Sequence, residues 1–298
     1  MTAIILDGTV VADRMRAEIA ADAARFKAEA GYAPGLGAVL AGDDPASAQY
    51  VRMKRRACEK VGIESVAHTM TAESTQEEVE AAVRALNDDP RIHGILVQLP
   101  LPPQINEQSV LSLVSLDKDV DGFHPVNIGR LAMKGREPTF TPATPTGCMV
   151  LLQEAGAQLS GANAVVIGRS NIVGLPMALL LLKANATVTV CHSRTRGIAD
   201  IVRQADIVIA AIGQPEYVKG DWIKPGAIVI DVGTNQIEDP SAEKGYRFIG
   251  DVEFEAAKEV AGAISKVPGG VGPMTITMLL QNTVKAAWRS LERERAVG

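Results

Sequence analysis

The stretch that decides the fold runs from Asn163 to Thr195 and reads "NAVVIGRSNIVGLPMALLLLKANATVTVCHSRT". An apolar run leads into Gly168 and Gly174, then into a helical apolar segment and a second β-like run. Glycines between a buried strand and a helix let backbone amides at the helix N-terminus face a pyrophosphate. The stretch therefore predicts the strand–turn–helix–strand unit of a Rossmann-type dinucleotide-binding domain. The alternative is that the glycines only let helix and strand pack closely.

The residues after the second strand bear on the choice of cofactor. An Asp or Glu there accepts hydrogen bonds from a ribose 2′-hydroxyl and repels a 2′-phosphate. This sequence instead has Ser193 and Arg194, with Arg169 in the turn and Ser170 at the place of the usual middle glycine. A guanidinium suits a phosphate dianion, and a serine hydroxyl can donate to it. The pattern favours NADP over NAD, unless the arginines are simply solvated.

The composition excludes several other classes of protein. Of 298 residues, 47% are hydrophobic and 22% charged, as in soluble globular proteins, and the net charge of -5 argues against nucleic-acid binding. Cys58, Cys148 and Cys191 are far apart and lack CxxC spacing, so we expect reduced core thiols and no metal. No signal peptide and no run of about 18 apolar residues is present. We therefore expect a cytoplasmic protein with neither a membrane nor a nucleic-acid partner.

The order of strands and helices predicts an α/β fold with two lobes. Residues 35–99 alternate as β-α-β-α-β, the order of a parallel open sheet. A polar segment rich in Gly, Pro and Thr follows, and we place the domain boundary within it. The expected domains are 1–143 (plus 277–298), an N-terminal catalytic domain, and 144–276, a C-terminal Rossmann-type domain. The last helix, from Met274, is long enough to return to the first lobe.

Candidate site residues of the first half come from three separate stretches. Tyr50 and Lys54 lie four apart on a predicted helix and so share a face, although such pairs are usually surface neighbours. "GILVQLPLP" puts Gln98 at the carboxyl end of a strand, where open α/β sheets bind ligands. The acids of "DKDVDGFHPVN", Asp121 among them, are either ligands or turn formers. "VPGGVGPMT" (267–275) predicts a loop with close backbone access to a flat ligand, or a plain connector.

Together these stretches resemble one family, the bifunctional methylenetetrahydrofolate dehydrogenase/methenyltetrahydrofolate cyclohydrolases. The resemblance covers nearly the whole chain, through "GDDPASAQYVRMK", "VQLPLP", "DKDVDGFHP", "TPATPTG", "VIGRSNIVGLP", "ADIVIAAIGQP", "GAIVIDVGTN" and "VPGGVGPMT". It implies NADP-dependent oxidation of 5,10-methylenetetrahydrofolate to 5,10-methenyltetrahydrofolate, then hydrolysis to 10-formyltetrahydrofolate. It also implies a homodimer that acts on tetrahydrofolate derivatives in one-carbon metabolism and purine biosynthesis.

The resemblance also implies roles for individual residues. Those expected to bind the folate substrate are Tyr50, Lys54, Val97, Gln98, Leu99, Asp121, Pro268, Gly269, Gly270, Gly272, Pro273 and Thr275. Those expected to bind NADP are Gly168, Arg169, Ser170, Gly174, Ser193, Arg194 and Thr234. Tyr50, Lys54, Gln98 and Asp121 form the expected catalytic set, and the loop from Pro268 to Thr275 would close over the site. Thr234 and Ala143 depart from the family, which commonly has isoleucine and cysteine there, without putting the activity in doubt.

The expected chemistry explains why no histidine base stands out. A hydride leaves the methylene carbon without a proton, so the dehydrogenase needs alignment and exclusion of water rather than a base. In the hydrolysis, Lys54 is the best candidate to move protons. Three alternatives stay open: a dehydrogenase without cyclohydrolase activity, a two-domain NADP dehydrogenase of a small hydroxy or keto acid, and a non-catalytic NADP-binding sensor.

Overall fold

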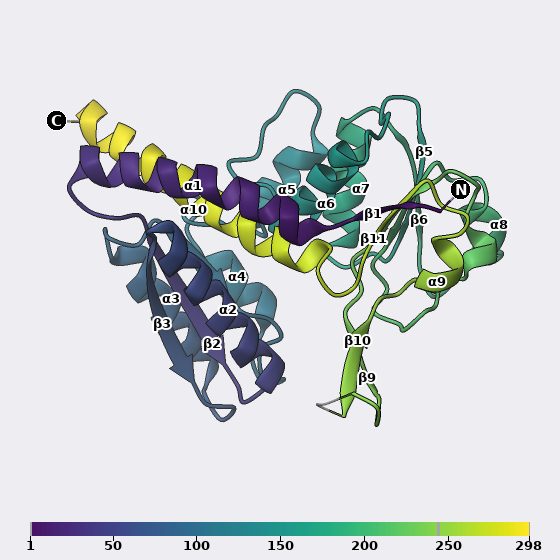
Figure 1. Cartoon of the computed structure of the whole chain (residues 1–298). Coiled ribbons are helices and arrows are strands. Elements are labelled where there is room, and N and C mark those ends of the chain that lie inside the picture. The colour runs from purple at the N-terminus through teal and green to yellow at the C-terminus, as the bar shows by residue number, and fades with distance from the viewer. Residues whose placement is uncertain (1, 243–244, 298) are drawn as a thin grey trace. The chain divides into compact units, whose positions relative to one another are not determined.

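The computed structural model describes residues 2–242 and 245–297 and divides the chain into two compact units. The six-stranded unit contains the residues up to Asp13 and Thr144–Thr275, and the three-stranded unit contains Arg14–Ala143 and the chain from Ile276 onward (Figure 1). We expected the residues before Arg14 in the first domain, whereas the structure groups them with the six-stranded unit. Strand β1 (Ile4–Leu6) pairs in parallel with β11 (Ala263–Ser265), which joins it to the six-stranded sheet.

The six-stranded sheet has the order β1-β11-β8-β7-β5-β6, and every pair in it is parallel. Its inner strands are β5 (Asn163–Ile167), β7 (Ile207–Ala210), β8 (Ile228–Asp231) and β11, with β6 (Thr187–Cys191) at one edge and β1 at the other. The inner strands are short runs of Val, Ile and Ala that are almost fully buried, as expected for a parallel sheet covered on both faces. The Rossmann-type prediction is confirmed.

Short helices complete the six-stranded unit. Its helical segments are α6 (Ala143–Glu154), α7 (Gly174–Lys183), α8 (Ile198–Val202), η1 (Gly220–Trp222) and α9 (Phe254–Ala257). An antiparallel hairpin of β9 (Asn235–Glu238) and β10 (Tyr246–Ile249) was not expected from the sequence. Its strands are only four residues long and β9 is largely polar, so the pair shows little of the apolar alternation by which a strand is recognised.

The three-stranded unit confirms the predicted β-α-β-α-β order. Its parallel sheet, β3-β2-β4, contains β2 (Gly35–Ala41), β3 (Glu64–Met70) and β4 (Gly94–Val97). The helices between these strands are α2 (Pro45–Val61) and α3 (Gln76–Asp88).

The longer parts of two helices complete this unit: α1 (Gly8–Ala30) from Arg14 onward, and α10 (Val271–Val297) from Ile276 onward. Leu279, Leu280 and Val284 of α10 pack in one apolar cluster with Ile19 of α1 and Leu36 of β2. The last helix therefore returns to the first lobe, as predicted.

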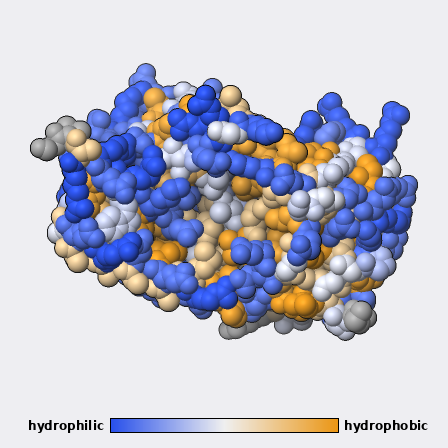
Figure 2. All heavy atoms as spheres, turned by 90° about the horizontal axis from the view of Figure 1, so that it is seen from above, coloured by the Kyte–Doolittle hydropathy of each residue, from blue (hydrophilic) through white to orange (hydrophobic). Residues whose placement is uncertain are grey.

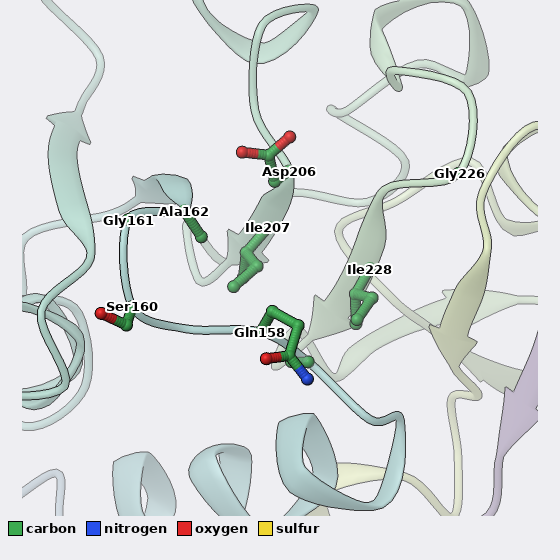
Figure 3. A pocket seen from close by; sticks show the side chains of 9 residues that line it. Gln158, Ser160, Gly161, Ala162, Asp206, Ile207, Gly226 and Ile228 are labelled. Atoms are coloured by element: carbon green, nitrogen blue, oxygen red, sulfur yellow. The ribbon is translucent and has the colours of Figure 1, made fainter.

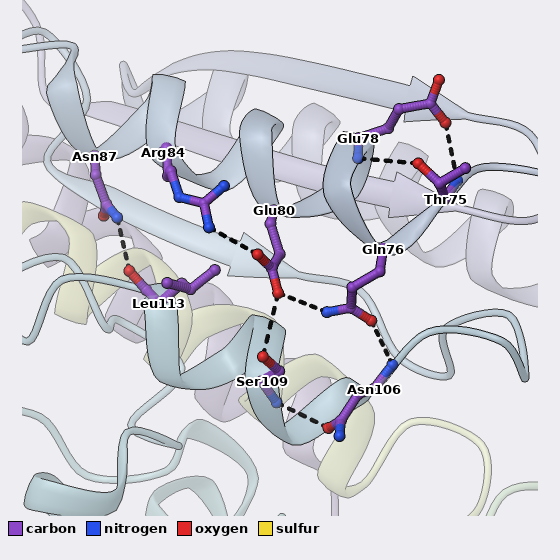
Figure 4. A network of polar contacts seen from close by, with 9 residues as sticks. All are labelled: Thr75, Gln76, Glu78, Glu80, Arg84, Asn87, Asn106, Ser109 and Leu113. Atoms are coloured by element: carbon purple, nitrogen blue, oxygen red, sulfur yellow. Dashed lines mark hydrogen bonds and ion pairs between the residues drawn. The ribbon is translucent and has the colours of Figure 1, made fainter.

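A polar network fixes the segment that follows β4 (Figure 4). The Glu80 carboxylate accepts hydrogen bonds from Gln76 Nε2 (2.7 Å), the Arg84 guanidinium (2.7 Å) and Ser109 Oγ (3.2 Å). Gln76 Oε1 in turn accepts from the backbone N–H of Asn106 (2.7 Å). Helix α4 (Glu107–Leu113), which the sequence did not predict, is thereby anchored to α3.

The surface is of mixed polarity (Figure 2), and the cysteines are reduced and buried as expected. Figure 2 shows hydrophilic and hydrophobic residues interspersed over the visible face. Among residues 2–242 and 245–297, no helix combines the length and the apolar character that a membrane crossing requires. The three cysteines are buried and free, and burial raises the pKa of Cys58 and of Cys148 to about 12, so both are unreactive thiols at neutral pH.

His93 is a structural histidine in the core of the three-stranded unit. Its ring is 3% exposed, stacks on Tyr32 and meets Phe26 edge-on. Nδ1 accepts a hydrogen bond from the backbone N–H of Gly35 at 2.9 Å, so the neutral tautomer carries its proton on Nε2. Burial, with the charge of Lys118, lowers the pKa of His93 from its ordinary 6.5 to about 4.

We expect this histidine to make the protein less stable in mild acid. Between pH 6.5 and about 4 the unfolded chain binds a proton at this position and the folded chain does not. The free energy of unfolding therefore decreases as the pH is lowered through this range, by up to about 1.4 kcal/mol per pH unit for this one proton. His93→Asn keeps an acceptor near Nδ1 and removes the titration. Urea unfolding over this range should show a shallower pH slope for the variant, and equal slopes would contradict the assignment.

Candidate active site

Tyr50, Lys54 and Gln98 come together as predicted. Helix α2 starts at Pro45 behind Asp44, whose carboxylate caps it by accepting from Ser47 N at 2.8 Å, and this start sets Tyr50 and Lys54 one turn apart. Lys54 Nζ donates to Gln98 Oε1 at 3.2 Å and lies 4.7 Å from the centre of the Tyr50 ring. Lys54 is 5% exposed and Gln98 9%. An amine this buried is uncommon, and this one has a specific acceptor.

Gln98 is held in one orientation by its own neighbours. Its backbone N–H donates to Val39 O at 2.9 Å, and its side-chain Nε2 donates to Leu99 O at 2.7 Å. Oε1 is therefore the atom left to accept from Lys54. The Val97 side chain is buried in an apolar cluster that also contains Val39, and Leu99 packs against the same cluster. Any contact of Val97 with a ligand would have to come from its backbone.

Lys118, Asp119 and Asp121 of the "DKDVDG" stretch have different surroundings. Lys118 Nζ donates to three carbonyls near the end of α3: Leu86 O (3.1 Å), Asn87 O (2.7 Å) and Asp89 O (2.8 Å). The Asp119 carboxylate accepts from three donors at the start of α5 (Pro125–Ala132): Phe123 N, His124 N and Asn127 Nδ2. These contacts set the turn, while Asp121, two residues on, is buried beside the charge of Lys54.

Burial dominates the electrostatics of Lys54 and Asp121. Loss of solvent lowers the pKa of the Lys54 ammonium, and the negative charge of Asp121 opposes that shift. Loss of solvent raises the pKa of Asp121 to about 6, and the positive charge of Lys54 opposes it. Each group partly compensates the other, so the pair holds a buried amine that can give up or take a proton more readily than a surface lysine.

The expected nucleotide turn has the strand-to-helix geometry that its sequence predicts. Gly168 follows β5 with φ +129°, and a Cβ there would lie 2.1 Å from Ala211 O. A Cβ at Gly174 would lie 2.3 Å from Gly168 O, so close packing alone requires both glycines. Ser170 Oγ accepts from the backbone N–H groups of Val173 (3.1 Å) and Gly174 (3.3 Å), so this hydroxyl caps the start of α7.

The ends of β5 and β6 bring Arg169, Ser193 and Arg194 to the same end of the sheet. Ile167 pairs with Cys191, so Arg169 and Ser193 each lie two residues beyond a matched pair on neighbouring strands. The turn after β6 is closed by two bonds, from His192 N to Thr195 Oγ1 and from Arg194 N to His192 Nδ1. The side chains of Arg169, Ser170, Ser193, Arg194 and Thr234 are exposed.

The glycine–proline stretch is shorter as a loop than the sequence suggested. A loop was expected from Pro268 to Thr275, but α10 begins at Val271, so only Pro268, Gly269 and Gly270 precede it. Gly272, Pro273 and Thr275 lie in the first turns of the helix, where a proline is tolerated because the first N–H groups have no partner within the helix. Thr275 Oγ1 lies 3.0 Å from Thr144 Oγ1.

The β1–α1 turn holds this loop, which the sequence did not indicate. Lys266 Nζ forms an ion pair with the Asp7 carboxylate, and Thr9 N donates to Gly269 O at 3.1 Å. A Cβ at Gly8 would lie 1.8 Å from Gly270 O, so only glycine fits there. The one available sequence signal was Asp7-Gly8 directly after an apolar run.

A pocket at the opposite edge of the six-stranded sheet is not part of this arrangement (Figure 3). It lies at the amino ends of the strands and is lined by Ala157, Gln158, Ser160, Gly161, Ala162, Asp206, Ile207, Gly226 and Ile228. Its one carboxylate, Asp206, already accepts from Asn163 N and Lys224 Nζ. Ligands of open α/β sheets bind at the carboxyl ends, where the Gly168 turn lies.

Comparison with known proteins agrees with both halves of this description. Residues 6–121 match the catalytic domain, and residues 142–291 the NAD(P)-binding domain, of tetrahydrofolate dehydrogenase/cyclohydrolase. The bifunctional protein FolD 2 of Geobacter sulfurreducens is 59% identical over 96% of this chain and 97% of its own length.

Solved structures are similar over nearly the whole chain. The crystal structure of the Trypanosoma brucei N5,N10-methylenetetrahydrofolate dehydrogenase-cyclohydrolase, complexed with NADP and an inhibitor, is 44% identical with a TM-score of 0.95. The match covers 98% of this chain and 99% of that one. That of the Campylobacter jejuni bifunctional enzyme is 44% identical with a TM-score of 0.90, covering 96% and 99%. This chain therefore belongs to the tetrahydrofolate dehydrogenase/cyclohydrolase family.

Proposed function

We propose that this chain is a bifunctional one-carbon folate enzyme. It oxidises 5,10-methylenetetrahydrofolate with NADP to 5,10-methenyltetrahydrofolate, and it hydrolyses that product to 10-formyltetrahydrofolate. The observation that carries the proposal is the buried Lys54 amine, hydrogen-bonded to Gln98, beside the Asp121 carboxylate and the Tyr50 ring. A hydrolase needs such a proton-exchanging group, and family membership supports both reactions.

The six-stranded unit fits a dinucleotide with a 2′-phosphate. The turn at Gly168 joins a buried strand to a helix, and the end of β6 offers a hydroxyl and a guanidinium instead of a carboxylate. In the proposal the residues from Gly168 to Gly174 hold the pyrophosphate, and Ser193 with Arg194 holds the 2′-phosphate. When bound, NADP supplies a hydride acceptor. The protein's part is alignment, with donor and acceptor carbons about 3–3.5 Å apart.

The hydrolysis needs proton transfers that Lys54 can provide. The oxygen of water bonds to the amidinium carbon, and one proton of that water passes to the neutral amine of Lys54. The carbon–nitrogen bond then breaks, and the departing nitrogen takes this proton from Lys54, so the neutral amine is regenerated. The second proton of the water leaves to solvent as the formyl C=O forms, so the hydrolysis releases one proton overall. Burial favours the neutral amine, and Gln98 fixes its direction. Asp121 would accept hydrogen bonds from the pterin amino and ring N–H groups, which match the two carboxylate oxygens.

The proposal is tested by assaying the purified chain with 5,10-methylenetetrahydrofolate and each nicotinamide cofactor in turn. We expect reduced cofactor to form with NADP, and separately supplied methenyltetrahydrofolate to decay faster than without protein. Oxidation without accelerated decay would identify a dehydrogenase alone, which the Lys54–Gln98 pair argues against. Turnover of small hydroxy acids only, or nucleotide binding without turnover, would contradict the proposal.

The cofactor preference is tested at the end of β6. Ser193→Asp places a carboxylate where a 2′-phosphate is proposed to lie, so we expect the KM for NADP to rise roughly 100-fold through charge repulsion. The KM for NAD should change much less, because a free 2′-hydroxyl can donate to the new carboxylate. Ser193→Ala is the matched control, and its affinity for NADP should fall only by the contribution of one hydrogen bond. Equal changes for both cofactors in Ser193→Asp would place the 2′-phosphate elsewhere.

Four further features remain proposals supported by the family resemblance. They are a homodimeric assembly, a place in purine biosynthesis, cytoplasmic localisation, and the closing of the Pro268–Thr275 segment over the folate. Sedimentation of the purified chain at several concentrations tests the first. A dimer that persists on dilution would support it, and a monomer at every concentration would refute it.

A further inference from the structure

A fully buried carboxylate orders the loop that follows β7. Asp251 is 0% exposed, and its Oδ2 accepts from the backbone N–H groups of Ile212 (2.7 Å) and Gly213 (2.8 Å). Its Oδ1 accepts from Gln214 N (2.9 Å) and from Asn235 Nδ2 (2.9 Å). One side chain therefore fixes three consecutive amides at the carboxyl end of β7 and ties them to the start of β9.

A second buried carboxylate holds the first in place. Asp231, the last residue of β8, accepts from Gly233 N and Asp251 N on Oδ1 and from Val252 N on Oδ2, each at 2.9 Å. The space is closed around both groups, because a Cβ at Gly250 would lie 1.8 Å from Asp231 Oδ2 and one at Gly233 would lie 2.2 Å from Asp251 Oδ1. The two aspartates thus hold the carboxyl ends of β7 and β8 as one rigid assembly.

The strand order tells which part of a dinucleotide would meet this assembly. In a doubly wound sheet the adenosine half lies over the first two strands of the nucleotide motif, and the other half lies beyond the point where the order reverses. Here the first two strands are β5 and β6, and the reversal places β7 and β8 on the other side of β5. The assembly therefore lies under the nicotinamide half. It also contacts the phosphate turn, since Gly168 packs directly on Ala211 O.

We propose that Asp251, held by Asp231, is a positioning residue for the nicotinamide half of NADP. Asp251 acts by orienting the backbone amides of Ile212, Gly213 and Gln214. The adenosine half is bound by residues at the ends of β5 and β6 and does not depend on Asp251. This inference rests on the proposed NADP-dependent function. It assigns a role to two carboxylates that the dehydrogenase and cyclohydrolase chemistry does not itself require.

The test compares two ligands that share the adenosine half. NADP spans both halves, whereas 2′,5′-ADP has the 2′-phosphate and lacks the nicotinamide. In Asp251→Asn the side-chain nitrogen cannot accept, so buried N–H groups lose their partner. We expect the Kd for NADP, by titration calorimetry, to rise roughly tenfold or more, while the Kd for 2′,5′-ADP stays within about twofold. Asp221→Asn, at an exposed carboxylate of the same unit, is the matched control and should change neither.

Asn235→Ala keeps the test decisive if Asp251→Asn does not fold. It removes the fourth donor to Asp251, together with a longer hydrogen bond to Ile249 O (3.5 Å), and should produce the same pattern with a smaller loss of NADP affinity. Equal weakening of both ligands, or unchanged NADP affinity, in either folded variant would overturn the inference. A wild-type chain that binds neither ligand would instead refute the proposed function.

Discussion

Lys54→Met is expected to lower the cyclohydrolase kcat roughly 10³-fold while hydride transfer remains measurable. Methionine has a similar length and fills the buried space, but it can neither take a proton from water nor donate to Gln98 Oε1. The hydride step involves no proton transfer. The substitution should therefore slow that step only to the extent that the Lys54 ammonium contributes to substrate binding. Two initial rates on one preparation measure the difference: formation of reduced cofactor, and decay of methenyltetrahydrofolate.

The control for this substitution is Lys60→Met, on the exposed part of the same helix, which should leave both rates unchanged. The wild-type pH profile gives a second readout. Only the neutral amine is a base, so the hydrolytic rate should rise with pH through the pKa of Lys54, which burial lowers from its ordinary value. Hydrolysis by Lys54→Met at the wild-type rate would remove Lys54 from the mechanism.

Asp121→Asn is expected to raise the KM for the folate substrates roughly 100-fold in both reactions, through the loss of two charge-assisted hydrogen bonds. Asparagine keeps the shape of the side chain but turns an N–H donor toward donors of the pterin. The substitution also removes the negative charge that opposes the lowered pKa of Lys54. The Lys54 pKa should therefore fall further, and the hydrolytic pH profile should shift to lower pH.

A matched control lies within the same short stretch. Asp117 is exposed and forms an ion pair with Arg293, so Asp117→Asn should leave both KM values unchanged. A rise in KM for one reaction only would mean that the two activities do not share the contact with Asp121. An unchanged KM in both would refute the proposed pterin contact.

Local patterns predicted the parts of the fold that consist of long, regular segments. The Asn163–Thr195 stretch formed β5, the turn, α7 and β6 as expected, because a buried strand and an apolar helix each carry a clear periodicity. The helical spacing of Tyr50 and Lys54 also held. The contact between Gln98 and Lys54 was harder to predict from the sequence. It depends on the pairing of β4 with β2, which brings the end of β4 beside α2.

What the sequence could not predict depends on distant partners. β1 and β11 have three residues each and become strands only through pairing with strands remote in the chain. The sequence does not tell which charged residues of "DKDVDG" are structural. In the structure Lys118 and Asp119 bind backbone groups, whereas Asp121 lies beside Lys54. In the sequence, Asp231 and Asp251 look like ordinary acids near strand ends. Their burial depends on Gly233 and Gly250, which pack directly against the two carboxylates.

The pairing of β1 with β11 has a consequence for the order in which the chain can fold during synthesis. Strand β1 has its partner far along the chain, with Ile4 beside Ala263. Closing so long a loop carries an entropic cost, and the pairing must wait until β11 has been synthesised. The Asp7–Lys266 ion pair and the Gly8–Gly270 contact can form only then, so a nascent chain completes its sheet edge and the glycine segment beside it in one late event.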